Sequence, residues 1–296
     1  MKKYIQISLF FSAIFILSDN SFAQQDSISY AFEASQQGNF TRAYSAIEAA
    51  TLHPSTAGDY QAWSLKAYIL KELSKKQQGV EAIELRYKSL ESVKTSIQLN
   101  KTRENFSQDS ALIDHLSRKF YNDAVSNLNS SGYNSAIRYF ETYEECVRII
   151  NPAAAANLKI REMDFKLALA NVYTSIYESN RKQNESFFEK TISLYNEILN
   201  NDPDNISANY SIGVLYYNKA VAIINEMDFE TDLIALSETQ DKTIEIFKKS
   251  LPFMEKAYQL NPKRKETLQG LEGIYYSLNE NEKYDKIKQE LIELEK

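Results

Sequence analysis

The chain has 296 residues, of which 43% are hydrophobic and 25% are charged, and its formal net charge at pH 7 is −6. Its 7 Gly and 5 Pro are too few to separate the many short strands of a β-sandwich or barrel. One Cys excludes a disulfide framework and a multi-cysteine zinc site, and two His leave little for a histidine metal cluster. The negative charge argues against a nucleic-acid-binding protein, which normally carries a basic face. These observations favour a helix-rich chain.

The first residues have the three-part pattern of a secretory signal peptide. Lys2 and Lys3 precede an apolar run over Tyr4–Leu17, and small residues stand three and one positions before a cut after Ala23. The apolar run is shorter than the ~20 residues that span a bilayer, so an uncut membrane anchor is the weaker alternative. No Cys lies near the cut, which excludes a lipid anchor at that point. We expect an exported protein in the periplasm or cell envelope of a Gram-negative-type bacterium.

Prolines mark a repeat along the rest of the chain. Asn151-Pro152, Asp202-Pro203 and Asn261-Pro262 each place a proline after an acid or amide, which is typical of the end of one helix and the start of the next. With Pro54 and a similar stretch around Asn100, these marks give a period of about 50 to 60 residues, and such periods are typical of repeat proteins.

Between these marks the apolar residues follow a helical spacing. Ala43, Ile47 and Ala50 are separated by four and three residues, so they share one helix face. The same spacing recurs over residues 136–147 and 192–199. Each block therefore predicts two helices, and the chain as a whole predicts a stack of helical hairpins.

The blocks resemble tetratricopeptide repeats, whose signature is W-x2-L-G-x2-Y, then A-x3-F, then P. In the first block Ala34, Gly38, Phe40, Ala43 and Pro54 fit this pattern. In the family, small residues let the helices of one hairpin, and neighbouring hairpins, approach closely. The resemblance covers nearly all of the chain after the predicted leader. It implies an all-α, right-handed antiparallel helix-pair solenoid, although these units are longer than the family's 34 residues and only one carries the Trp.

This resemblance gives a domain plan with a leader at 1–23 and a solenoid over 24–296. The expected units are about 24–57, 58–101, 112–152, 153–204, 205–262 and 263–296. The fifth unit carries an insertion at about 218–249, in which apolar residues continue at helical spacing. We expect one hairpin grown by several turns, with its tip near Asp228 to Ser237, and the alternative is a disordered loop.

Few residues are suited to catalysis. Cys146 follows two carboxylates, which oppose thiolate formation, so we expect a buried structural residue. His53 is expected in the turn that ends the first block and His115 at the start of the first helix of the third, without metal-ligand spacing. The scattered glycines form no phosphate-binding loop. The basic triplet at 263–265 is interpreted as a solvated turn, with a phosphate or acidic-lipid contact as the alternative. We expect no enzyme activity, no cofactor and no metal.

The family resemblance assigns a partner-binding groove to the first helices of the repeats. Tyr offers a large contact area and one hydroxyl at a small entropy cost, which suits a protein-binding groove. The residues that align with this face are Tyr68, Lys71, Tyr121, Asn171, Tyr210, Tyr217 and Asn218.

The resemblance implies a non-catalytic exported scaffold or adaptor that binds a protein or peptide partner. Two alternatives remain open: an envelope glycan- or polymer-binding module, and a regulatory subunit of a secretion or enzyme complex. We expect no nucleic-acid partner and membrane association only through partners. The chain is expected to be a monomer or part of a hetero-complex.

Overall fold

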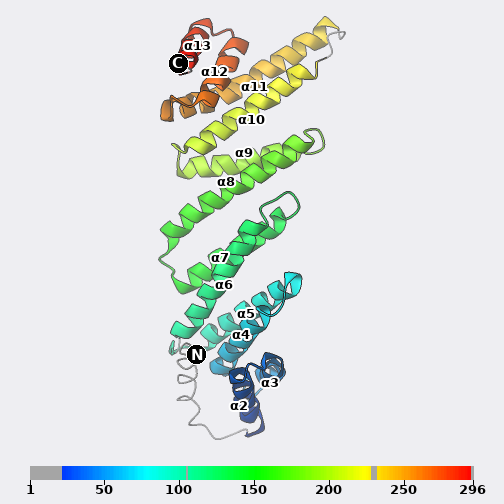
Figure 1. Ribbon diagram of the computed structural model, residues 1–296, viewed down its shortest axis with the longest axis vertical. Coiled ribbons are helices and arrows are strands. Elements are labelled where there is room, and N and C mark those ends of the chain that lie inside the picture. Colours follow the sequence, from blue (N-terminus) through cyan, green and yellow to red (C-terminus); the bar gives the residue numbers. More distant parts are fainter. Residues whose placement is uncertain (1–21, 105, 228–231, 295–296) are drawn as a thin grey trace. The chain divides into compact units, whose positions relative to one another are not determined.

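The computed structural model describes residues 22–104, 106–227 and 232–294 (Figure 1). Over these residues the chain forms helices and no strand, and successive helices pack as adjacent pairs. The predicted fold class, an all-α helix-pair solenoid, is confirmed. In the described part of the chain, every helix is too short or too polar to span a membrane.

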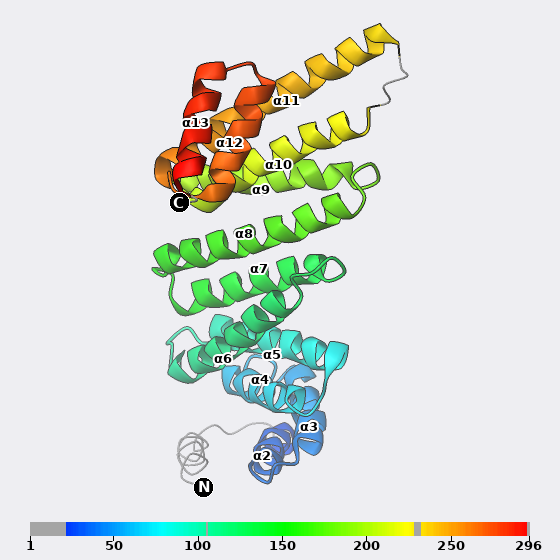
Figure 2. The same ribbon diagram turned by 45° about the horizontal axis from the view of Figure 1, so that its top comes forward.

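Within the described residues the helices form six hairpins, in each of which the second helix returns along the first (Figure 2). The pairs are α2 (Phe22–Gln36) with α3 (Phe40–Leu52), α4 (Tyr60–Ser74) with α5 (Gly79–Leu99), α6 (Phe106–Ser126) with α7 (Tyr133–Ile150), α8 (Ala155–Ser179) with α9 (Glu185–Asn201), α10 (Ile206–Asn225) with α11 (Leu233–Leu260), and α12 (Lys265–Ser277) with α13 (Asn281–Leu294).

The predicted leader at 1–23 lies outside the described residues, apart from Phe22 and Ala23 at the start of α2. The rest of the chain divides into two compact units. The first holds the residues up to Ala124 together with Ile137–Ala156, and the second holds Val125–Ala136 together with Asn157–Lys296. Each unit is described by itself below.

Small side chains build the helix crossings of the first unit. Ala31, Ala43, Ile47 and Ala50 are fully or almost fully buried between α2 and α3, and α4 adds Ala62 to the same core. Because an Ala occupies little more than its backbone, the helices approach closely and bury the larger residues around the crossing. The periodic alanines of the sequence are therefore the contact points that the repeat pattern predicts.

A buried carboxylate joins three helices of the first unit. Asp109 of α6 is 3% exposed, and its two oxygens accept hydrogen bonds from Ser64 of α4 at 2.6 Å and Ser96 of α5 at 2.8 Å. Burial raises the pKa of the Asp109 carboxyl, and the two hydroxyl donors oppose that rise. This contact fixes the position of α6 against the preceding hairpin.

Aromatic rings fill the second unit. Phe188 of α9 lies 5.3 Å from the ring of Tyr177 on α8 and 5.4 Å from that of Tyr216 on α10, measured between centroids. Near the start of α7, Tyr133 stacks edge-on against Tyr173 at 5.4 Å. These pairs have the tilted or edge-to-face geometry that the aromatic quadrupole favours.

The ends of the helices follow the turn signals of the sequence. Pro54, Pro152, Pro203 and Pro262 each stand two residues after the last residue of a helix. Asn and Asp side chains cap several of the helices that follow, since these residues accept hydrogen bonds from the free backbone N–H groups of a first turn. The caps are Asn39 of α3, Asp59 of α4, Asn205 of α10 and Asp232 of α11.

Three expectations need correction. The third unit was expected from residue 112, but α6 begins at Phe106, so His115 lies in the middle of that helix and not at its start. The expected tip of the long hairpin reached Ser237, whereas α11 already begins at Leu233, because Asp232 caps its first turn. The apolar pattern located both helices, but the cap that starts α11 was missed.

Candidate partner-binding surfaces

The predicted groove residues of the first unit are half-buried. Tyr68 and Lys71 lie one turn apart on α4, and the Lys71 ammonium stands 4.4 Å from the centroid of the Tyr68 ring. Phe40 of α3 also packs against the Tyr68 ring, edge-on, with the ring centroids 6.2 Å apart. Tyr121 of α6 packs against Tyr143 of α7 at 5.1 Å. The structure thus brings Tyr68 and Lys71 together, and it places Tyr121 in a helix-packing contact.

Lys71 belongs to a group of charges on α4. Its ammonium pairs with the carboxylate of Glu72, which is also paired with Lys75 at 2.8 Å. Burial is the main effect on Lys71 and lowers its pKa, while Glu72 acts in the opposite direction and Lys75 adds repulsion. Two lysines therefore share one carboxylate, which leaves positive charge uncompensated.

His115 on α6 adds to this group. Burial lowers the pKa of the imidazole below its usual value, and Lys71, Lys75 and Lys119 lower it further through their positive charge. Lysines of two first helices, α4 and α6, thus act on one neutral imidazole, and Glu72 opposes them. We call Lys71, Lys75 and Lys119, together with the His115 that they surround, the cationic cluster. Sequence reasoning placed Lys71 in the groove but did not connect His115, Lys75 or Lys119 with it, because their proximity depends on the packing of α6 against α4.

Three of the four predicted residues of the second unit contact side chains from other segments. Asn171 of α8 accepts a hydrogen bond from the hydroxyl of Tyr195 on α9 at 3.2 Å. Tyr210 of α10 lies under the guanidinium of Arg264, 3.5 Å from the ring centroid. Asn218, also on α10, is half-buried. Arg264 comes from the basic triplet at 263–265, and its guanidinium covers one face of the Tyr210 ring.

Tyr217 lies at the meeting of three helices. Its ring stands 5.7 Å from that of Phe247 on α11, and its hydroxyl occupies the space that a Cβ on Gly273 of α12 would need, at 2.5 Å. Burial raises the pKa of this hydroxyl, and Glu272 raises it further. Tyr217 therefore contributes to packing in the second unit, and a binding role for it stays a prediction.

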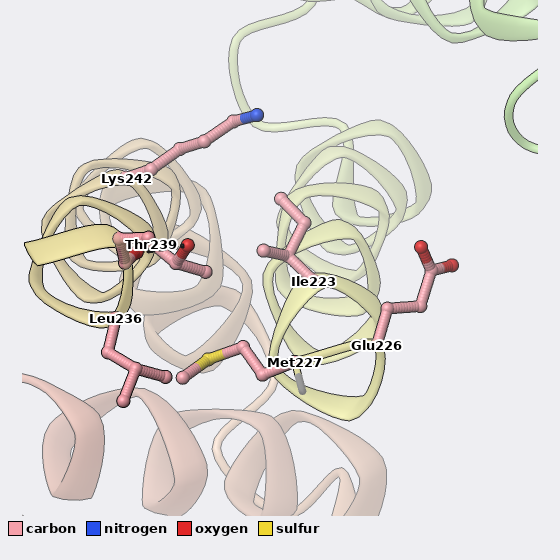
Figure 3. Close-up of a pocket in the computed structure, with 7 residues that line it drawn as sticks. Ile223, Glu226, Met227, Leu236, Thr239 and Lys242 are labelled. Carbon is pink, nitrogen blue, oxygen red and sulfur yellow. Dashed lines mark hydrogen bonds between the residues drawn. The ribbon is translucent and has the colours of Figure 1, made fainter. Parts of the chain in front are cut away.

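A cleft opens between the two arms of the long hairpin, near its tip. It has a volume of about 410 Å³, and Figure 3 shows Met227, two residues past the end of α10, and Leu236 of α11 pointing toward one another across it. The lining residues are Ile223, Glu226, Met227, Ala235, Leu236, Thr239 and Lys242. The sequence predicted a helical hairpin at this insertion, but the apolar pattern did not predict a cleft between its arms.

Two other residues considered for chemistry, Cys146 and His53, lie apart from the cationic cluster. Cys146 is 0% exposed, and burial, followed by the charge of Glu145, raises its pKa to about 12. His53 is exposed and caps the end of α3. Over residues 22–104, 106–227 and 232–294, no group of three or more His, Cys, Asp or Glu side chains is placed to hold a metal ion.

The fold type follows from the paired helices, which have alanines and glycines where they cross. The described part of the chain is an all-α helix-pair solenoid. No family model matches it, and neither does any curated protein. Among solved structures it is similar to human IFIT1 as a dimer with m7Gppp-AAAA, with 14% identity and a TM-score of 0.35 over 91% of this chain. It spans about half the length of that protein, covering 50% of it.

Two further solved structures are similar over most of this chain. One is the TPR2AB domain of yeast Sti1 in a pHSP90 complex, at 12% identity and a TM-score of 0.26, covering 92% of this chain and 98% of that one. The other is the TPR domain of P58(IPK), at 12% identity and a TM-score of 0.23, covering 92% and 97%.

Proposed function

We propose that the protein is an exported, non-catalytic scaffold or adaptor that binds an acidic segment of a protein partner in the cell envelope. The observation that carries this proposal is the cationic cluster of the first unit. The chain as a whole has a net charge of −6, so a local excess of positive charge stands out against its surface. Complementary charge steers a partner to its site and selects against partners of the wrong sign.

The cluster offers more than charge. Lys71 and Lys75 compete for one carboxylate, so an incoming Asp or Glu side chain relieves their mutual repulsion. The Tyr68 ring beside Lys71 supplies an apolar contact area next to the charged groups. An extended acidic segment with an apolar or aromatic neighbour matches both features.

A binding titration tests this proposal. A fluorescently labelled peptide rich in Asp and Glu is titrated with the whole chain, and the anisotropy is followed at several salt concentrations. We expect Lys71→Met and Lys75→Met each to weaken binding about tenfold, since a charge-assisted hydrogen bond contributes about 1.5 kcal/mol. Lys182→Met is the matched control, because Lys182 is 85% exposed and lies in the second unit.

Both outcomes of the titration are informative. Weaker binding by the two cluster variants, unchanged binding by the control and unchanged thermal unfolding of all three support the proposal. Equal affinity of all variants, or binding that does not weaken as salt rises, would contradict it. The same variants tested on a Lys-rich peptide report whether any loss is specific to acidic ligands.

The export part of the proposal rests on the leader pattern at 1–23 and needs its own test. The full chain is expressed in a Gram-negative host, the cell is fractionated, and the mature product is sequenced from its N-terminus. We expect a periplasmic product that begins at Gln24. Ala23→Leu places a large residue next to the cut and should leave the leader attached. A full-length cytoplasmic product of the unaltered chain would refute export.

A further inference from the structure

The end of the long hairpin exposes two neighbouring apolar residues. Leu233 is 84% exposed and Ile234 is 72% exposed, the two highest values among the large apolar side chains that the structure describes. Single exposed apolar residues are normal on protein surfaces, whereas adjacent ones on a projecting element are typical of an interaction site. Packing within the hairpin does not account for the exposure of these two side chains, and contact with a partner would.

Their position on the helix is well fixed. The Asp232 carboxylate accepts hydrogen bonds from the backbone N–H groups of Ile234 at 2.8 Å and Ala235 at 3.0 Å, which caps the first turn of α11. Leu233 and Ile234 thus stand on an ordered turn. Leu233 also lies one turn before Leu236, which lines the cleft of Figure 3, so the apolar surface continues from the cleft onto the outside of the hairpin.

Negative charge follows the apolar pair along the helix. Glu238 and Asp241 stand four and seven residues after Ile234, so the three share one face, and all are exposed. Asp232 adds a third carboxylate at the start of the helix. The sequence from Asp232 to Asp241 holds no Lys or Arg. The next residue, Lys242, stands four residues after Glu238 and also lines the cleft, so over residues 232–242 three carboxylates stand against one ammonium.

The exposed end of α11 lies beyond the ends of the neighbouring helices α12 and α13. The helix α11 has 28 residues, against 13 in α12 and 14 in α13. At ~1.5 Å per residue the difference is roughly 20 Å, and Figure 1 shows the α10–α11 hairpin extending beyond the α12–α13 pair. A partner can therefore approach the end of α11 without meeting the last hairpin.

We propose that Leu233, Ile234, Glu238 and Asp241, which we call the tip surface, bind a cationic amphipathic helix of a partner protein. An apolar side chain of that helix covers Leu233 and Ile234, and Lys or Arg residues one and two turns along it face Glu238 and Asp241. Charge complementarity decides the occupant: the carboxylates repel an anionic membrane surface and attract a basic segment. This site is distinct in charge from the cationic cluster, so the protein would hold two partners of opposite sign.

A peptide titration with the whole chain tests the tip surface. The probe is a labelled helical peptide of Leu and Lys, with the two residue types on opposite faces. A scrambled peptide of the same composition and a peptide with Glu in place of Lys are its controls. We expect the double variant Leu233→Ser, Ile234→Ser to bind the probe at least tenfold more weakly. We expect the double variant Glu238→Lys, Asp241→Lys to lose binding and its salt dependence.

Matched variants keep the test specific. Leu52→Ser removes a 71% exposed apolar residue from α3, and Glu141→Lys reverses an exposed charge on α7; neither should change the affinity. Equal binding of the scrambled peptide, or unchanged affinity of both tip variants, would overturn the proposal. Binding of anionic vesicles in preference to the peptide would also overturn it, as would a self-association that the Ser variant abolishes.

Discussion

Met254 of α11 occupies the space that a side chain on Gly213 of α10 would need. A Cβ built on Gly213 would stand 2.5 Å from the Met254 Cγ and 2.6 Å from its Sδ, well inside normal contact. The same methionine closes over Gly270 of α12. In addition, the buried Ser250 hydroxyl donates a hydrogen bond of 2.6 Å to the Gly213 carbonyl. One close helix crossing therefore holds three helices of the second unit together.

Replacing Gly213 should destabilise the protein. Gly213→Leu forces Met254 and the α11 backbone to move, and overpacking of this kind costs roughly 1–3 kcal/mol. The free energy of unfolding is measured by urea denaturation followed by circular dichroism. Gly58→Ala is the control, since a Cβ there meets nothing within 4 Å. A Gly213→Leu variant as stable as the unaltered chain would show that this crossing is not close-packed.

Asp109 should make stability depend on pH. Because burial raises its folded-state pKa above the unfolded value, the folded protein binds this proton more tightly than the unfolded chain does. The protonated Asp109 therefore contributes to the free energy of unfolding. This contribution is complete at a pH below the pKa of Asp109 in the unfolded chain, and it is lost as the pH rises through the pKa of Asp109 in the folded protein. Asp109→Asn removes this dependence while keeping polar atoms beside Ser64 and Ser96.

The measurement compares unfolding free energies of the two chains from pH 3 to 8. Relative to Asp109→Asn, the unaltered protein should lose stability as pH rises above about 4, by ~1.4 kcal/mol for each pH unit that separates the two pKa values. Parallel curves, or a relative gain with rising pH, would mean that the two hydroxyl donors outweigh burial at this carboxylate.

Removing the Tyr217 ring should lower the free energy of unfolding, which a role in partner binding alone would not predict. Removing the ring in Tyr217→Ala leaves space between α10, α11 and α12, which we expect to cost about 1–3 kcal/mol for a half-buried aromatic residue. Tyr217→Phe keeps the ring and should cost much less. Thermal unfolding of both variants separates these effects. A stable Tyr217→Ala chain with weakened partner binding would instead support the groove role.

Cys146 should be unreactive in the folded protein. The thiolate is the reactive form, and a buried thiol with a pKa of about 12 holds almost none of it at neutral pH. A colorimetric thiol reagent should therefore release its signal only when urea unfolds the first unit. Rapid modification at pH 7 without denaturant would show that α7 opens easily around this residue.

Local signals in the sequence predict the helices better than they predict the sites. Alternating small and large residues, such as Ala43, Ile47 and Ala50, report directly on the face that packs, so the hairpins follow from spacing. Pro152, Pro203 and Pro262 mark helix ends because proline cannot continue a helix. In contrast, the start of α11 depends on one capping residue, Asp232, which the apolar pattern does not include.

The candidate sites depend on contacts between distant residues. Tyr210 and Tyr217 align with a binding face, and the pattern gives no sign that Arg264, just before α12, covers the Tyr210 ring or that Gly273 of α12 meets the Tyr217 hydroxyl. Likewise, the effect of Lys71 on His115 requires α6 to lie against α4. A repeat pattern cannot predict these contacts. It predicts where each helix lies, but not which side chains of neighbouring helices will meet.

The proposed binding of an acidic partner is tested most directly by the pKa of His115, measured by NMR of its imidazole protons. In the free chain the pKa should lie below its usual value of 6.5, because burial and then the positive charge of the surrounding lysines lower it. A saturating acidic peptide should raise this pKa, while the signals of His53, which is exposed in the turn after α3, should not move. A His115 pKa that stays the same with saturating peptide would contradict the account.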